Sequence, residues 1–353
     1  MRIAKLGAGS EAYYLHNVAA GAEDHRRGGM EPDGAWLGRG AASLGLQGPV
    51  AAAPLTAVLG GSHPGTGAPL RPARSRVRVV GFDLTVAAPK SVSVLEGLGD
   101  PVLGATVRAA HEAAVAGALG YVDREASWAR RHQGGRVRQV PVRGLVVAAF
   151  VHRTSRASDP HLHSHVLVAN LGEADDDTWS ALDARGLYAH ARTAGYLYQA
   201  GLRHELGQRL GARFGPVVNG VAQLAGVDPR VTSHLSRRRA EVEKRLAAWG
   251  TATPAAAQAA ALATRGAKPP ARPEAELRAG WRDQVRALGA DPEVLRPPAS
   301  PVPGPVPGTD EVASVVVGRG GPLAARATFG RRELVRAVAA ALPAGAPPTA
   351  VEG

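Results

Sequence analysis

Four histidines lie within fourteen positions near the middle of the chain, in the segment VHRTSRASDPHLHSHVLVANL at 151–171. They are His152, His161, His163 and His165, out of twelve histidines in the whole sequence. Neutral imidazoles suit divalent transition metals, and three of them leave coordination positions open for a substrate oxygen. A lone histidine is more often a satisfied core or surface residue, but a cluster of four predicts a metal site.

Two expected β-strands carry these histidines. GLVVAAFVHR at 144–153 is an apolar strand long enough to be central, and HLHSHVLVANL at 161–171 is a second, joined to the first by the short turn SRASDP. Alternate side chains of a strand share a face, so His152 lies on one face with Phe150, and the three other histidines share a face of the second strand. Cross-strand neighbours lie close enough to bind one ion together. The spacing alone does not select three ligands, and it leaves an oxygenase, a hydrolase and a phosphodiester-cleaving site open.

The balance of charge favours a polyanionic partner. The 353 residues are enough for two domains at most, and they contain 42 Lys plus Arg against 30 Asp plus Glu, a formal net charge of +12. Only four of these cations are lysines. Guanidinium groups match the geometry of phosphates, so the composition fits a nucleic-acid partner. The alternative is an arginine-rich composition with solvated charged faces.

Several classes of protein are excluded or disfavoured. The chain has no cysteine, which excludes disulfides, thiolate zinc sites and cysteine nucleophiles, so any metal must bind His, Asp or Glu. No G-x-x-x-x-G-K-[ST] phosphate loop for ATP occurs. No signal segment or long apolar run occurs either, and we expect a cytoplasmic protein without stable membrane insertion.

The remaining sequence predicts alternating helices, strands and basic loops. RRHQGGRVRQVPVRG at 130–144 reads as a basic hairpin around a Gly-Gly turn, and FGRRELVRAVAAAL at 329–342 as a lone amphipathic helix. The other expected elements are a helix at 10–20, a strand at 77–86 that turns at Pro89 into a helix, an Ala-rich helix at 102–119, a helix at about 193–212, and a very basic helix within 228–250.

The histidine segment resembles a known motif. H-R-T-S-R-A-S-D-P-H-L-H-S-H is similar to the third motif of the TrwC/TraI-type (MobF) conjugative relaxases, which are HUH endonucleases. The resemblance implies that His152, His163 and His165 hold a divalent metal, magnesium or manganese with zinc as an alternative. His161 stands where relatives usually carry glutamine, so it is expected beside the ligands or at the surface.

Two further segments carry the resemblance, which extends from about residue 10 to 290. GFDLTVAAPKSVSVL at 81–95 is similar to the second relaxase motif, in which Asp83 corresponds to the acid beside the nucleophile and the metal histidines. A carboxylate there can fix the tautomer of a ligand histidine and accept a proton. YYLHNVAAGAED and WLGRGAASLGLQGPV resemble the segment that holds the catalytic tyrosines, so Tyr13 matches the first catalytic tyrosine and Tyr14 is its neighbour.

One departure from the family pattern affects the chemistry. Relatives typically carry a second tyrosine cluster after the acidic pair, and this chain has His25 and Arg26 in its place. Tyr13 and Tyr14 are therefore the nearby candidates for a nucleophile. Without the motif context, both would be read as helix residues that pack against the core.

The resemblance implies a fold, a domain organisation and an activity. The expected fold is α/β (α+β), a relaxase-type sandwich whose central, mainly antiparallel sheet is flanked by helices. Residues 1–290 would form the relaxase domain, 291–308 a Pro-rich linker, and 309–353 a tail that resembles the truncated start of a helicase region. The implied activity is metal-dependent, site- and strand-specific cleavage of single-stranded DNA at an origin of transfer through a 5′-phosphotyrosine.

The same resemblance suggests binding residues and partners. Lys90 and Arg156 lie inside matched motifs and are candidates for DNA phosphate contacts, with a structural or surface role as the alternative. Three Arg-rich stretches, 71–78, 124–143 and 237–245, are expected to line the DNA groove. A conjugation coupling protein or secretion apparatus is a further expected partner.

Two other functions compete with this interpretation. A truncated, non-catalytic DNA-binding relaxase remnant would explain the missing second tyrosine cluster and the missing motor. The histidines alone also fit a β-barrel metal oxygenase. The D-L-T-x-x-x-P-K-S and S-R-x-x-D-P motifs, at 83–91 and 155–160, argue against the oxygenase.

Overall fold

The structure is a computed structural model that describes residues 1–7, 33–71, 78–251, 253–264, 272–292 and 307–353. The helix expected at 10–20 lies outside these residues, and so do Tyr13 and Tyr14. The two strands and the acidic residue expected at the metal site all lie within them.

The described residues form a central five-stranded sheet with the order β1-β3-β7-β6-β2, in which every neighbouring pair is antiparallel. The strands are β1 Arg2–Gly7, β2 Ala35–Leu37, β3 Val79–Ala87, β6 Val147–Thr154 and β7 Pro160–Ala169. β6 and β7 are adjacent central strands joined by the short turn, as their apolar sequences predict. The expected mainly antiparallel sheet is confirmed.

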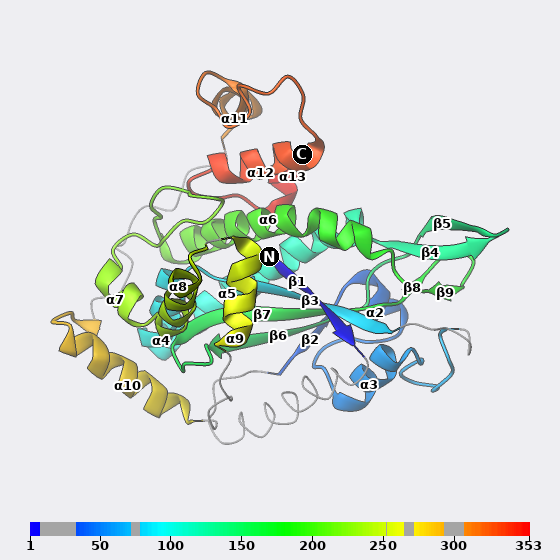
Figure 1. The fold of residues 1–353 in the computed structure, drawn as a ribbon, viewed down its shortest axis with the longest axis horizontal. Coiled ribbons are helices and arrows are strands. Elements are labelled where there is room, and N and C mark those ends of the chain that lie inside the picture. The colour runs from blue at the N-terminus through cyan, green and yellow to red at the C-terminus, as the bar shows by residue number, and fades with distance from the viewer. Residues whose placement is uncertain (8–32, 72–77, 252, 265–271, 293–306) are drawn as a thin grey trace.

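Two long helices cover one face of this sheet, α5 Pro101–Glu125 and α6 Ala184–Leu210 (Figure 1). Alternate strand residues such as Leu84 and Val166 are buried in the core that these helices share with the sheet. Asp100 begins α5, because its side chain accepts a hydrogen bond from the Leu103 N–H at 2.8 Å and Pro101 follows it.

The other face of the sheet is divided between apolar and polar residues. Short helices α2 Arg39–Ser43 and α3 Ala52–Gly60 share a second core with apolar side chains of this face, including Phe150 and Leu167. The histidines continue along the same face, because Phe150 lies directly opposite His165 in the β6–β7 ladder. One face of the sheet therefore serves the main core, and the other presents the candidate site.

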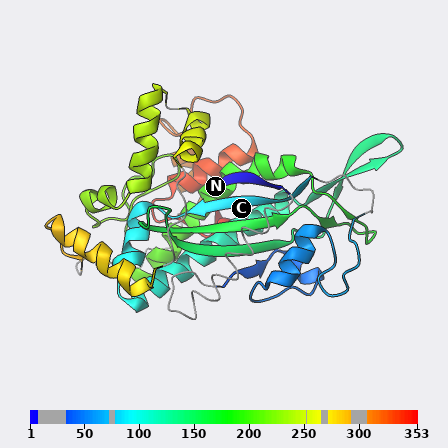
Figure 2. The same ribbon diagram turned by 60° about the horizontal axis from the view of Figure 1, so that its bottom comes forward.

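A basic hairpin projects from one end of the molecule, and helices gather at the other end (Figures 1 and 2). The hairpin consists of β4 Trp128–Gln133 and β5 Arg136–Pro141, and the pair β8 Gly172–Glu173 and β9 Trp179–Ser180 lies beside it. Gly134 and Gly135 connect β4 to β5 with φ of 59° and 73°, the left-handed backbone that a tight hairpin turn requires. The predicted hairpin is confirmed. The helices at the other end include α4 Lys90–Leu98, α7 Pro229–His234, α8 Arg237–Trp249 and α10 Glu274–Ala287.

Two helix predictions are corrected. α6 begins at Ala184 rather than at about residue 193, because the buried Asp183 side chain accepts a hydrogen bond from the Arg185 N–H. The single basic helix expected within 228–250 is two helices, α7 and α8. The break between them places Leu235 in a buried cluster with Trp281, whereas α8 itself has no buried residue. α9 Pro254–Ala263 follows and packs on α8.

The C-terminal residues form three helices, α11 Thr309–Val317, α12 Arg331–Ala341 and α13 Pro348–Glu352. The amphipathic helix expected at 329–342 is α12, but it is not a lone helix, because it packs on α6 and places Val335 in the main core. The buried Arg203 of α6 donates hydrogen bonds to the carbonyl oxygens of Ala339 at 2.8 Å and Leu342 at 3.1 Å. Among the described residues, no helix is long and apolar enough to span a membrane.

Candidate metal centre

The structure brings three of the four clustered histidines together. His152 on β6 lies directly opposite His163 on β7, and His165 follows two residues later on the same face. One ligand atom from each of these three side chains lies within 4.8 Å of the others. The ring centroid of His152 lies 5.3 Å from that of His163 and 5.0 Å from that of His165. The antiparallel register therefore creates the cluster from two adjacent strands.

In two of the three rings, a hydrogen bond at Nδ1 fixes the orientation of the ring. Nδ1 of His165 lies 2.8 Å from Oδ2 of Asp83, which lies on the neighbouring strand β3. Nδ1 of His163 lies 2.8 Å from the carbonyl oxygen of His161. Since both partners only accept, each Nδ1 carries the proton and donates it, and Nε2 of each ring keeps its lone pair. This is the tautomer that binds a metal through Nε2.

Burial and neighbouring charges favour the neutral form of two rings in the cluster, His163 and His161. Burial, reinforced by the neighbouring histidines, holds the pKa of His163 well below its ordinary value. Burial and the Lys90 charge lower the pKa of His161 to about 4. Neutral imidazoles are the form that coordinates a divalent ion, so the donor set present here fits such an ion. His161 stacks on His163 with ring centroids 4.6 Å apart but lies outside the group of three.

The turn that joins the two histidine-bearing strands, β6 and β7, is held by hydrogen bonds from three helices. Lys90 at the start of α4 donates to the carbonyl oxygen of Pro160 at 2.6 Å. Arg237 at the start of α8 donates to the buried Asp159 carboxylate at 2.7 Å. Trp281 of α10 donates to the carbonyl oxygen of Ser158 at 2.8 Å. Burial lowers the pKa of Lys90 to about 8. The hydrogen bond to Pro160 gives Lys90 a structural role. The contact of Lys90 with DNA stays a prediction.

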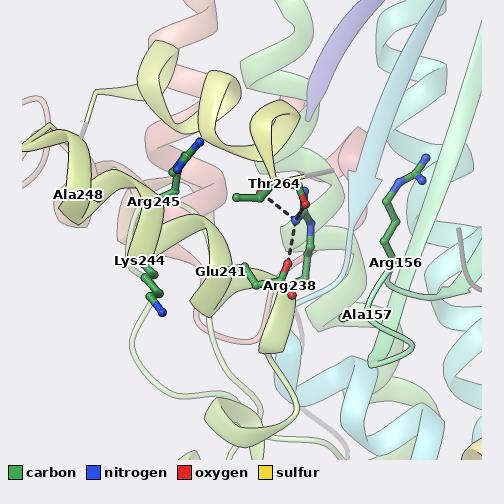
Figure 3. Close-up of a pocket in the computed structure, with 8 residues that line it drawn as sticks. All are labelled: Arg156, Ala157, Arg238, Glu241, Lys244, Arg245, Ala248 and Thr264. Atoms are coloured by element: carbon green, nitrogen blue, oxygen red, sulfur yellow. Dashed lines mark hydrogen bonds and ion pairs between the residues drawn. The ribbon is translucent and has the colours of Figure 1, made fainter. Parts of the chain in front are cut away.

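Arg156 lies in the same turn and lines a cavity of about 470 Å³ between this turn and the helices α8 and α9 (Figure 3). The lining contains four cationic side chains and one carboxylate, together with small residues: Arg156, Ala157, Arg238, Glu241, Lys244, Arg245, Ala248 and Thr264. Arg238 is held by the Glu241 carboxylate and by the carbonyl oxygens of Ala261 and Thr264. The cavity therefore has an excess of positive charge beside the ligand hairpin.

The contacts that Arg237 and Trp281 make with the turn do not follow from the sequence pattern. Arg237 belongs to a stretch that was expected to line a DNA groove, yet its guanidinium binds Asp159 and the carbonyl oxygen of Ala157. The D-P pair in the turn was the available signal, since a buried carboxylate requires a cationic partner. The identity of that partner depends on a contact across 78 positions of the chain.

The fold and the site together define the class of protein: a sandwich whose antiparallel sheet presents, on one face, three histidines that could hold a metal ion, as expected for a relaxase of the HUH endonuclease type. Residues 7–288 match the family model of the TrwC relaxase. The chain therefore belongs to the TrwC relaxase family, and the β-barrel oxygenase interpretation is wrong.

Known proteins and solved structures agree with this assignment. The multifunctional conjugation protein TraI of Escherichia coli is 34% identical over 273 residues, which are 74% of this chain and 15% of TraI. The chain thus spans about 15% of the length of this relative. Conjugative relaxase TrwC in complex with OriT DNA is similar in its metal-bound structure, with a TM-score of 0.73 and 30% identity, and in its metal-free structure, with 0.72 and 29%. Each match covers 83% of this chain and 99% of the TrwC chain.

Proposed function

We propose that this chain is a metal-dependent relaxase that cleaves one strand of single-stranded DNA at an origin of transfer and forms a 5′-phosphotyrosine link. The observation that carries the proposal is the pair of hydrogen bonds from Nδ1 of His163 and His165, which leaves Nε2 of both rings for an ion beside His152. Membership of the TrwC relaxase family supports the same activity.

Phosphodiesters are unreactive because their negative charge repels nucleophiles and their alkoxide is a poor leaving group. A divalent ion supplies Lewis-acid polarisation of a phosphate oxygen and neutralises the charge that develops in the transition state. His152, His163 and His165 would hold this ion, for which magnesium or manganese is proposed and zinc is the alternative. Asp83 orients His165 through a 2.8 Å hydrogen bond. It is also the proposed acceptor for the proton of the attacking hydroxyl.

Tyr13 is the proposed nucleophile, with Tyr14 as the alternative. Its phenolic oxygen loses a proton and attacks the phosphorus, while the bond to the 3′ oxygen breaks and that oxygen takes up a proton. The products are a 5′-phosphotyrosine link and a free 3′-hydroxyl, and the reverse reaction rejoins the strand without ATP. Because His25 and Arg26 replace the second tyrosine cluster, the chain performs one cleavage and its reversal.

The cavity that Arg156 lines is the proposed path of the DNA strand beside the metal centre. Lys244 and Arg245 add positive charge on the helix side (Figure 3). The guanidinium of Arg245 also lies 5.4 Å from the ring centroid of Trp249, which is 41% exposed. Exposed guanidinium groups and an exposed aromatic ring are the elements that bind a single strand through phosphates and bases. Lys90 contributes positive charge at the turn. The proposed activity also implies a cytoplasmic location and contact with a coupling protein or secretion apparatus.

A comparison of two neighbouring histidines tests the proposal. His163→Ala removes a ligand, whereas the matched control His161→Ala removes a ring on the same strand and face but keeps the backbone carbonyl that binds His163. We expect His163→Ala to lose Mn²⁺ binding by titration calorimetry and to lose cleavage of single-stranded origin oligonucleotides. His161→Ala should retain both. DNA affinity should survive in both variants, because arginine contacts to phosphates supply most of it.

Undiminished Mn²⁺ binding by His163→Ala would overturn the metal site. If the unchanged protein binds Mn²⁺ and DNA but forms no covalent adduct on oligonucleotides that tile the DNA flanking its gene, a non-catalytic relaxase remnant becomes the better description.

A further inference from the structure

A polar side chain lies in the apolar layer directly behind the metal strand. Ser164 is between His163 and His165 on β7, so its side chain points to the opposite face of the sheet, toward α5 and α6. Its neighbours across the ladders are Val86 on β3 and Val151 on β6, and Ser164 is 1% exposed. A hydroxyl in such a layer is costly unless it is hydrogen-bonded.

The partner of Ser164 is a histidine that the chemistry above does not use. Nε2 of His111, on α5, lies 2.7 Å from Oγ of Ser164. Nδ1 of His111 lies 2.8 Å from the hydroxyl of Tyr198 on α6. All three side chains are buried, and burial lowers the pKa of His111 to about 3, so its ring is neutral with one N–H. One nitrogen therefore donates and the other accepts, which satisfies the whole network.

The strand pairing is irregular where this network attaches. The β6–β7 ladder is regular from Val147 to His152 and then shifts register between His152 and Thr154, beside the ligand pair His152 and His163. On its other side, the β3–β7 ladder ends at the pair Ala87 and His163. Beyond that pair, one further backbone hydrogen bond runs from the Ala88 N–H to the carbonyl oxygen of Leu162 at 3.0 Å. The regular ladders therefore stop on both sides of β7 next to His163. A side-chain anchor from the helix layer restrains the strand there.

We propose that His111 is a positioning residue for the metal centre and acts through Ser164. The hydrogen bond holds the segment from His163 to His165 at a fixed rotation and height relative to the helix layer. A rotation of β7 about its axis would move both ligand rings, because they share the face opposite Ser164. Tyr198 holds the His111 ring in the orientation that reaches the strand. The inference rests on the proposed function only in that the three histidines bind a divalent ion.

The test compares Mn²⁺ affinity in variants of the full chain by titration calorimetry, with thermal unfolding measured in parallel. Ser164→Ala removes the anchor without touching a ligand, and we expect about a tenfold loss of Mn²⁺ affinity, the lower end of the effect of removing partners that orient metal ligands. Ser164→Thr keeps the hydroxyl and should restore most of the affinity.

The matched control is Tyr121→Phe. It removes a 2.7 Å hydrogen bond between Tyr121 and His190, which joins the same two helices without reaching the sheet. If the only effect is weaker packing between the two helices, the melting temperature should fall in Tyr121→Phe as it does in Ser164→Ala. Mn²⁺ affinity should fall only in Ser164→Ala.

Mn²⁺ affinity within twofold of the unchanged protein in a folded Ser164→Ala variant would overturn the inference and leave the metal site intact. If Ser164→Ala does not fold, Tyr198→Phe replaces it, and equal Mn²⁺ affinity in Tyr198→Phe and Tyr121→Phe would overturn the inference. Absence of Mn²⁺ binding in the unchanged protein would instead overturn the proposed function.

Discussion

At the scale of single residues, the chemistry of the site depends on which nitrogen of each histidine carries the proton. Strand alternation predicts from the sequence that three histidines of β7 share a face, but it includes His161 among them. Contacts between strands distinguish the three candidate ligands from His161, since His152 lies opposite His163 and Asp83 reaches His165 from β3. Only the family resemblance selected these residues before the register was known.

Replacement of the Asp83 carboxylate tests whether its hydrogen bond to His165 orients that ring for metal binding. Asp83→Asn keeps the shape of the side chain but removes the charge that holds the Nδ1 proton of His165. We expect Mn²⁺ affinity to fall about 10-fold to 100-fold, as for other partners of metal-bound histidines. Asp176→Asn is the control, because that carboxylate is exposed and binds Arg131 outside the site. Equal affinity in the two variants, measured by calorimetry, would contradict the role assigned to Asp83.

At the scale of elements, periodicity predicts the central strands β6 and β7 and the long helix α5, but it misses the first turns of α6. The contacts that anchor the elements also do not follow from periodicity. α10 is attached to the sheet by Glu274, which accepts hydrogen bonds from Arg153 of β6 at 2.9 and 3.0 Å and from Arg278 of α10 at 2.6 Å. Arg153 also binds Glu96, which is completely buried. Nothing in the local sequence links positions 153 and 274, because their pairing depends on the path of the whole chain.

This anchor predicts a pH dependence of stability. Partial burial raises the pKa of Glu274, but the hydrogen bonds and charges of Arg153 and Arg278 outweigh it and lower the pKa from 4.5 to about 2. A carboxyl whose pKa is depressed on folding stabilises the protein above its unfolded pKa and loses that effect as the pH falls toward its folded pKa. Glu274→Gln should therefore lower the free energy of unfolding by about 2 kcal/mol at pH 6.

The difference in the free energy of unfolding between Glu274→Gln and the unchanged protein should shrink below pH 4.5 and vanish near pH 2. Urea denaturation at pH 6 and pH 3 measures it. Glu276→Gln, on the same helix and with a side chain 58% exposed, should change stability little at either pH. A difference for Glu274→Gln that stays constant between these two pH values would refute the anchor.

At the scale of the whole molecule, residues near the C-terminus belong to the main core. An amphipathic pattern predicts that α12 has an apolar face, but it does not name the surface that covers this face. The structure places it on α6, with Val335 3% exposed and Arg203 bound to the end of α12. The division into a relaxase domain at 1–290, a Pro-rich linker at 291–308 and a helicase-like tail at 309–353 stays a prediction.

Two valine substitutions test whether α12 is part of the main core. Val335→Ala leaves a cavity in the core, and we expect it to lower the free energy of unfolding by about 2 kcal/mol. Val315→Ala on α11 removes the same atoms from a side chain that is 51% exposed and should cost little. Equal stabilities of the two variants in denaturant titrations would show that α12 does not share the core.

The proposed activity is tested most directly by the covalent adduct. Single-stranded oligonucleotides that tile the DNA flanking the gene are incubated with the full chain and Mn²⁺, and the products are separated under denaturing conditions. We expect one sequence to give a protein–DNA adduct that chelation of the metal abolishes. Tyr13→Phe should abolish it as well, because the phenolic oxygen is the attacking atom, whereas Tyr14→Phe should retain it. Full adduct from Tyr13→Phe, or no adduct from the unchanged protein on any of these oligonucleotides, would contradict a relaxase that cleaves DNA through Tyr13.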